Sequence, residues 1–554
     1  MHGNLIEDRL SYRIVRRIVP VLCLVLAYSQ VSASPPASRP PLFRGLGTLH
    51  HPVRTRSPLA QRYFDQGLKL CYAFNHDEAI RAFREAARLD PSCAMAHWGI
   101  AYALGPNVNL PVDPDRERQA FEEIGRARTL AAKGEARDRA FVEALAHRYS
   151  GDPAADLHAL DLAYADAMRA LSKRYPADLD AQVLFAEALL DTRPWDWWTH
   201  EGTPQPGTLE AIAALERVLA KNPAHIGANH LYIHAIEESP EPSKAVPCAN
   251  RLAGLAPGAG HLVHMPSHIL ILVGRYHDAS SLNERAIAID KAYIQAERPQ
   301  GMYPVMYYVH NMHMAWAAMS LEGRSADALR MARTVASHVS PEAVRAMPPM
   351  EFWVPVPYYA MARFGKWSEI LGEAAPPADL RYSSGMWHYA RGLALAATGK
   401  PGEAAAERDS VAAIAAATPP DAIVGLNPAA PLLRLAARVL DGAIAVRSGH
   451  YGDAVERFTA AVAEQDSLHY DEPPPWYFPV RQSLGAALLL DGKPKQAEAA
   501  FRADLTRYPA NGWSLFGLSK ALEAQGRKTE AARAKTEFRR AWAHADFPLE
   551  TPAL

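Results

Sequence analysis

The sequence predicts an all-α protein, a solenoid in which pairs of antiparallel helices stack on one another. Three observations predict it: a pattern of small and aromatic residues that recurs about every 34 residues, alanine-rich stretches that favour helix over strand, and 44 prolines among 554 residues. Because proline ends helices and is barred from central strands, so many prolines suit short helices separated by turns. A chain this long also exceeds one simple hydrophobic core, so it must form several domains or an extended repeat array.

The composition is that of a folded protein whose positive and negative charges balance. Hydrophobic residues make up 49% of the chain and charged residues 21%, which argues against wholesale disorder. The 59 Lys and Arg residues are balanced by 60 Asp and Glu residues, for a net charge of -1. This balance excludes the broad basic surface that nucleic acid or an anionic membrane requires, so we expect no nucleic-acid partner.

The N-terminal residues 1–33 have the features of a signal peptide. Arg13, Arg16 and Arg17 precede an apolar run over residues 18–28, and the small residues at 31–33 are a candidate cleavage site. The run is short for a membrane span, although a buried or anchoring helix is the alternative. We therefore expect an exported protein, periplasmic or extracellular, with no stable membrane span after cleavage. Residues 34–57, rich in Pro and Ser at their start, are predicted to be a flexible lead-in.

Three cysteines follow the predicted signal peptide: Cys71, Cys93 and Cys248. An odd number leaves at least one thiol unpaired within the monomer. An exported location permits a disulfide between Cys71 and Cys93, which sequence spacing alone does not establish.

The repeat is clearest from Tyr63 to Pro91. Small residues at positions 8 and 20 of a 34-residue unit let two helices approach, Phe at position 24 fills the gap, and Pro at position 32 stops the second helix. This spacing resembles the tetratricopeptide (TPR) repeat, a pair of antiparallel helices. The residues that carry it are Tyr63, Gly67, Ala79, Phe83, Ala86 and Pro91; Ala211, Leu215 and Pro223; Ala279; Ala328; Gly392 and Ala404; Gly442, Ala454, Phe458 and Ala461; and Gly485, Ala497, Phe501 and Pro509.

The resemblance covers most of residues 58–544 and implies a TPR-type superhelix, with a closing helix pair over 513–544. We divide it into N-terminal repeats (58–190), a histidine-rich central part (191–345) and C-terminal repeats (346–544), followed by a tail (545–554). We find no β-hairpin or βαβ pattern.

Histidines gather in the central part, where nine of the 22 lie between His225 and His313. In TPR proteins, positions 2, 5, 9 and 12 of each first helix face the concave surface. On this register three successive helices direct imidazoles into one concavity. The residues are His230, His234 and Glu237 on the first helix, His261, His264 and His268 on the second, and His310 and His313 on the third.

Helix geometry supports a metal site without reference to the family. Residues at i, i+4 and i+7 share one face of a helix, and two histidines at i and i+4 can bind one ion. Imidazole and carboxylate ligands suit Zn, Cu or Fe, with Glu237 as a further ligand or a general base. Five to seven histidines exceed the needs of one tetrahedral ion, so either two ions bind or some histidines support the ligands. A histidine-lined pocket for an organic or anionic ligand, and purely structural hydrogen bonding, are the alternatives.

Unusual aromatic and acidic strings are predicted to wall a pocket beside these histidines. Their simpler interpretation is aromatic packing in loops between repeats; the functional one is a pocket that holds an aromatic or apolar ligand. The pocket residues we select are Arg193, Asp196, Trp197 and Trp198, then Tyr307, and finally Asp471, Glu472 and Trp476.

These strings, together with Gly-Ala-Asn-His-Leu-Tyr-Ile-His at 227–234 and the segment 258–268, resemble a large bacterial group of exported TPR proteins. The resemblance implies the fold and no established activity. TPR domains that clamp a peptide carboxylate use Lys, Arg and Asn in the groove, whereas this groove offers His, Glu and Asp. No metalloprotease H-E-x-x-H motif, P-loop, dinucleotide fingerprint or G-x-S-x-G motif is present.

Three functions follow from this reading. The first is a metal site in the groove that supports metal-dependent chemistry on a small molecule. The second is an interaction scaffold for other envelope proteins, without catalysis. The third is a metal carrier or sensor.

Overall fold

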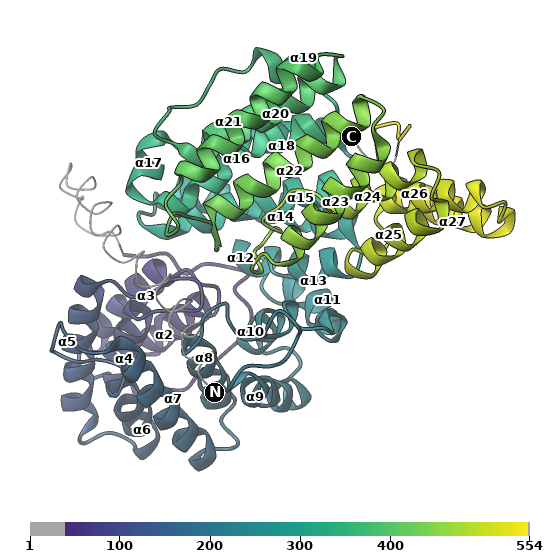
Figure 1. Cartoon of the computed structure of the whole chain (residues 1–554). Coiled ribbons are helices and arrows are strands. Elements are labelled where there is room, and N and C mark those ends of the chain that lie inside the picture. Colours follow the sequence, from purple (N-terminus) through teal and green to yellow (C-terminus); the bar gives the residue numbers. More distant parts are fainter. Residues whose placement is uncertain (1–38, 552–554) are drawn as a thin grey trace, which may run out of the picture. The chain divides into compact units, whose positions relative to one another are not determined.

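The computed structural model describes residues 39–551, and this part of the chain is built almost entirely of helices (Figure 1). Within it the strands are a single two-residue pair, in which β1 (Ile423–Val424) runs antiparallel to β2 (Asn427–Pro428). The predicted all-α class is confirmed. The predicted signal peptide lies outside the described residues.

The chain forms two compact units. Unit 1 comprises residues 39–269 and Arg285–Tyr308, and unit 2 comprises Leu270–Glu284 and residues 309–551. The helices of unit 1 are α2 (Pro58–Cys71), α3 (His76–Leu89), α4 (Ala94–Leu104), α5 (Pro114–Ala131), α6 (Ala136–Ala146), α7 (Leu157–Arg174), α8 (Leu179–Asp191), α9 (Thr208–Lys221), α10 (Ile226–Glu237), η1 (Pro242–Ala245), α11 (Val246–Leu255), α12 (Gly260–His264) and the π-turn η2 (Tyr303–Tyr307).

Three helices contain a boundary between the units: α13 (Pro266–Leu272), α14 (Tyr276–Glu297) and α15 (Tyr308–Glu322). The remaining helices of unit 2 are α16 (Ser325–Ser337), α17 (Pro341–Ala346), η3 (Pro348–Trp353), α18 (Val356–Arg363), α19 (Trp367–Gly372), α20 (Arg381–Ala397), α21 (Pro401–Ala417), α22 (Ala429–Arg447), α23 (Tyr451–Asp466), α24 (Val480–Leu490), α25 (Pro494–Arg507), α26 (Gly512–Ala524) and α27 (Lys528–Ala541). The boundaries fall inside the predicted central block 191–345, so its histidines are shared between the units.

The packing within two of the helix pairs follows the predicted repeat closely. A Cβ built on Gly67 of α2 would lie 2.5 Å from the Phe83 ring of α3, and one on Gly485 of α24 would lie 2.5 Å from the Phe501 ring of α25. The aromatic ring at position 24 therefore occupies the space that a side chain at position 8 would need, so only glycine fits at position 8. All the alanines predicted at position 20 are fully buried; they are Ala79, Ala211, Ala279, Ala328, Ala404, Ala454 and Ala497.

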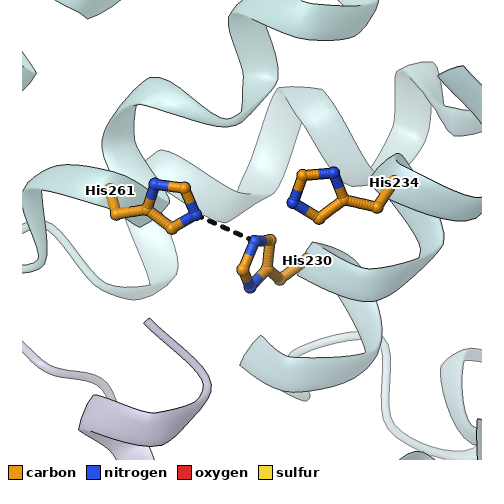
Figure 2. Close-up of side chains that lie close together, drawn as sticks. All are labelled: His230, His234 and His261. Atoms are coloured by element: carbon orange, nitrogen blue, oxygen red, sulfur yellow. Dashed lines mark hydrogen bonds between the residues drawn. The ribbon is translucent and has the colours of Figure 1, made fainter. Parts of the chain in front are cut away.

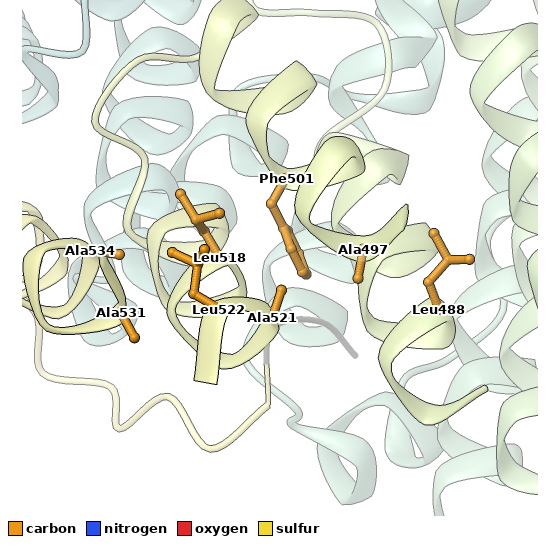
Figure 3. Close-up of a cluster of buried hydrophobic side chains, with 8 residues drawn as sticks. All are labelled: Leu488, Ala497, Phe501, Leu518, Ala521, Leu522, Ala531 and Ala534. Atoms are coloured by element: carbon orange, nitrogen blue, oxygen red, sulfur yellow. The ribbon is translucent and has the colours of Figure 1, made fainter. Parts of the chain in front are cut away.

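The C-terminal repeats show how this unit propagates. Figure 3 shows Phe501 beside Ala497 of its own helix, close to Leu518 and Ala521 of the next helix, α26. A Cβ on Gly517 of α26 would also collide with the Phe501 ring. One ring thus joins its own helix pair to the following one, and the predicted closing pair is confirmed as α26 and α27.

The described part of the lead-in is anchored to unit 1. The Phe43 amide donates to Gln66 Oε1 on α2 at 2.8 Å, and the Gly258 amide donates to the Gly45 carbonyl at 2.8 Å. His51 is buried, with its Nδ1 atom 2.7 Å from Asp180 Oδ2 on α8. Specific hydrogen bonds therefore hold a segment whose composition predicts flexibility.

The described residues also show the state of the cysteines and the character of the helices with respect to a membrane. Cys71, Cys93 and Cys248 are buried free thiols, so Cys71 and Cys93 are not bonded to each other. Across residues 39–551 no helix combines the length and the apolar character that crossing a membrane requires.

Candidate metal centre

The first two predicted ligands lie on α10, a helix that is buried on every side. All its residues from Ile226 to Glu237 are buried, so His230 and His234 face protein and not an open groove. His225 caps the start of the helix, and its Nδ1 accepts from the Ala228 amide at 3.2 Å. A helix buried all round suits the interior of a stack, and it places two imidazoles where water does not compete for a ligand.

The next three histidines lie on two short helices and not on one. His261 and His264 belong to α12, which ends at His264, and His268 belongs to α13, which begins at Pro266. Proline lacks the amide that would continue the helix and is suited to the first helical position, which explains the break. All three histidines are buried.

His230, His234 and His261 converge. One nitrogen from each ring lies within 4.8 Å of the others, and Figure 2 shows the three rings pointing toward one another. His230 Nε2 is 3.1 Å from His261 Nε2, and the His230 ring centroid is 4.9 Å from that of His234. A tetrahedral ion bonded to nitrogen at 2.0–2.1 Å separates its ligand atoms by about 3.3 Å. The three rings therefore fit one transition-metal ion.

Hydrogen bonds at the opposite ring nitrogens orient two of these ligands. His230 Nδ1 donates to the Tyr72 carbonyl at 2.7 Å, which leaves its Nε2 with a lone pair. His234 Nδ1 lies 2.8 Å from Glu237 Oε1. Metal-bound histidines are held in this way by a carbonyl or carboxylate. His261 Nδ1 is buried without a hydrogen-bond partner, so no such bond fixes its tautomer.

Burial disfavours the charged form of two of these histidines. Desolvation, followed by the neighbouring His234, lowers the pKa of His230 well below its usual range. Desolvation and the adjacent His230 and His264 do the same for the pKa of His261. Neutral imidazole is the form that binds a metal.

Two bulky aromatic residues in strained backbone conformations cover the three histidines. Phe74 has φ +53° and Trp195 has φ +56°. The Phe74 ring centroid lies 4.4 Å from that of His230 and 5.3 Å from that of His261, and Trp195 meets His234 edge-on at 5.7 Å. Positive φ is costly for bulky residues and concentrates at functional sites. Neither Phe74 nor Trp195 is among the residues predicted from the sequence, although Trp195 lies between the predicted pocket residues Arg193 and Asp196.

The other predicted pocket residues of unit 1 have mixed roles. Arg193 and Asp196 form a partly exposed ion pair with a 2.5 Å N–O distance. The Trp197 indole donates to the Leu190 carbonyl at 3.0 Å, and the Trp198 indole donates to the Ala235 carbonyl of α10 at 2.9 Å. Tyr307 packs against His261 with ring centroids 5.0 Å apart. Tyr307 thus borders the histidines, whereas Trp197 and Trp198 anchor their loop.

The third predicted histidine helix, α15, carries its ligands in unit 2. His310 and His313 both belong to that unit. The His313 ring stacks on Trp316 at 5.2 Å, its Nδ1 accepts from the Trp353 indole at 3.2 Å, and burial lowers its pKa to about 3. Within unit 1, the structure brings together imidazoles from α10 and α12.

The acidic string of unit 2 is folded into its own interior. Asp471 is buried and accepts amide hydrogen bonds from Leu426 and Glu472, both at 2.9 Å; burial raises its pKa to about 6. Glu472 is buried and accepts from the Tyr470 hydroxyl at 2.5 Å. Trp476 packs against Tyr389 with centroids 5.4 Å apart. Asp471 and His313 line one small cavity of about 10 Å³, the size of a single water.

A second group of potential ligands in unit 1 already holds a cation. One ligand atom each from His51, Asp178 and Asp180 lies within 4.8 Å of the others. The Arg137 guanidinium sits against them, with Nε 2.6 Å from Asp178 Oδ2 and Nη2 3.0 Å from His51 Nε2. This group is an ion-pair network that fixes the lead-in to α8.

Solved structures similar to this chain include helical proteins of low sequence identity. The human IFIT1 dimer with m7Gppp-AAAA matches with a TM-score of 0.33 and 13% identity, over 81% of this chain and 90% of that one. Yeast Tom70 matches with a TM-score of 0.26 and 10% identity, over 87% of this chain and 89% of that one. These scores are too low to carry an inference. No protein-family model matches the sequence, and no curated protein matches it.

Proposed function

We propose that the protein binds a transition-metal ion, Zn, Cu or Fe, through His230, His234 and His261 and uses it for chemistry on a small molecule in an exported location. The observation that carries this is the convergence of three buried ring nitrogens within 4.8 Å, two of them on rings whose Nδ1 atoms are already engaged. Three histidine ligands leave a fourth position for water or substrate.

A metal explains the cluster better than hydrogen bonding does. His230 Nδ1 donates to a carbonyl, so its neutral ring has only a lone pair at Nε2. If His261 Nε2 carried a proton, it could donate to His230 Nε2, which lies 3.1 Å away. That hydrogen bond would not explain why the His234 ring also lies against the His230 ring. One ion accepts all three lone pairs at once. When bound, it supplies a Lewis acid or, for Cu and Fe, a redox centre.

One wall of this site is apolar. The ring of Phe74 lies close to all three imidazoles, with centroids 4.4 Å from His230, 5.3 Å from His261 and 5.8 Å from His234. Such a wall excludes bulk water and strengthens electrostatic interactions at the ion. The site therefore suits a small, weakly polar ligand.

Metal analysis of the natively purified full-length chain tests the proposal. We expect about one tightly held ion at this site in the wild type, lost in H230A/H234A while the circular dichroism stays helical. His97 is the matched control because its Nδ1 also pairs with a glutamate, Glu123, at 2.7 Å, outside the cluster. H97A should keep the ion. A folded wild type that neither retains metal nor takes up Zn, Cu or Fe would refute the proposal.

Two alternatives give different results in the same preparation. A carrier or sensor would release its ion to a weak chelator within minutes, whereas a catalytic centre should retain it. An interaction scaffold, which the stacked TPR-type helix pairs themselves favour, would fold and bind a protein partner with no metal at all.

A further inference from the structure

A second pair of ring nitrogens lies beside the three-histidine site. His264 Nε2 is 2.7 Å from His268 Nε2, and both side chains are buried. The two rings lie on either side of the break between α12 and α13. Across the two groups, the centroids of His261 and His264, and those of His234 and His268, are both 5.7 Å apart.

The Glu237 carboxylate connects the two groups. Its Oε1 lies 2.8 Å from His234 Nδ1, and its Oε2 lies 2.8 Å from His268 Nδ1. All three side chains are buried. With Nδ1 turned to the carboxylate, each imidazole presents Nε2 on its other side, His234 to the first group and His268 to His264. One carboxylate thus contacts a nitrogen in each group, through a hydrogen bond to His234 and a close ion-pair contact to His268.

We propose that His264 and His268 form a second metal position next to the first, and that Glu237 is a positioning residue for both positions and a ligand of neither. This rests on the proposed function, because it adds an ion to the same site. The second position takes a divalent transition metal, since its donors are imidazole nitrogens.

The chemistry of the linking residue makes the proposal specific. A carboxylate is acceptor-only, so it can accept from both Nδ1–H groups and leave both Nε2 atoms with lone pairs. The amide of Glu237→Gln offers one acceptor and one donor. The glutamine NH2 group would donate to the Nδ1 atom of one of the two histidines. That Nδ1 atom must then be the unprotonated one, so the proton of the neutral ring moves to Nε2. That ring can no longer bind a metal through Nε2.

Metal stoichiometry of the full-length protein, loaded with Zn²⁺ alone and dialysed, is the test. We expect two ions per chain in the wild type, one in H264A/H268A, and a 10–100-fold weaker affinity for at least one ion in E237Q. Glu123→Gln is the matched control, because Glu123 holds a single histidine, His97, and should leave both ions in place. Loading with Cu²⁺ adds a readout: two adjacent ions reduce the paramagnetic resonance signal per copper, and H264A/H268A restores it.

The outcomes separate this inference from the proposed function. A wild-type chain that binds a single ion, lost in H230A/H234A and kept in H264A/H268A, overturns the second position and leaves the first. E237Q that binds both ions as tightly as the wild type overturns the positioning role. A wild type without any ion overturns both proposals. The wild-type stoichiometry decides the main point even where a variant fails to fold.

Discussion

Removing the Phe501 ring should destabilise the C-terminal repeats more than an average core truncation. Phe501 is fully buried in a cluster with Leu518 and Leu522 of α26. Phe→Ala in a core costs about 3–5 kcal/mol, with the larger values where the surroundings cannot collapse into the cavity. The ring lies between Gly485 and Gly517, which have no side chains to move inward. We therefore expect F501A to cost about 4–5 kcal/mol.

The opposite change, G485A, crowds the same space. Its new Cβ would lie 2.5 Å from the Phe501 ring, too close for carbon atoms. Overpacking costs about 1–3 kcal/mol, offset by about 1 kcal/mol from the better helix propensity of alanine. The net expected cost is about 1 kcal/mol. In the double variant the methyl group has no ring to meet and fills part of the cavity, so we expect a total of about 4 kcal/mol, at least 1 kcal/mol below the sum.

Hydrogen exchange measured by mass spectrometry on peptides of α24, α25 and α26 is the suitable assay, because repeat proteins unfold in parts and a single global transition is not assured. Gly452→Ala is the control: this helical glycine has open space around its Cβ position, so the change should be neutral or stabilise by up to about 1 kcal/mol. Strict additivity of F501A and G485A, within about 0.3 kcal/mol, would refute the shared cavity.

Two carboxylates of α8 predict opposite pH dependences for unit 1. Burial alone would raise the pKa of Asp180, but hydrogen bonds from His225 and His51 outweigh it and hold the pKa well below its usual range. This stabilisation is present above about pH 4 and is lost as the pH falls; D180N should flatten the acid limb of a melting-temperature profile. Burial, reinforced by Asp191, raises the pKa of Glu187. Its contribution is complete below about pH 4 and is lost as the pH rises through the raised pKa, so E187Q should make unit 1 less sensitive to pH between 5 and 9. A profile for either variant that matches the wild type at every pH would contradict the corresponding assignment.

The sequence determined the repeat because the repeat is local. Gly67 and Phe83, or Gly485 and Phe501, lie 16 residues apart on the two helices of one hairpin, and a glycine facing an aromatic ring at that spacing leaves few other ways to pack. The i, i+4 and i+7 stripe of His230, His234 and Glu237 also follows from helix geometry alone. These features survive any arrangement of distant segments.

Tertiary structure decided which groups contact the helix face that carries His230, His234 and Glu237. The turn carbonyl of Tyr72 that orients His230 lies 158 residues away in the sequence, and no local pattern pairs them. The positive φ of Phe74 and Trp195 arises because their surroundings fix the turns more strongly than the residues' own preferences do. Glu237 was predicted as a ligand or base on its spacing, whereas the structure places its second oxygen 2.8 Å from His268 Nδ1 on another helix. Sequence spacing reveals which residues share a helix face, but the contacts between helices determine which nitrogen remains for a metal.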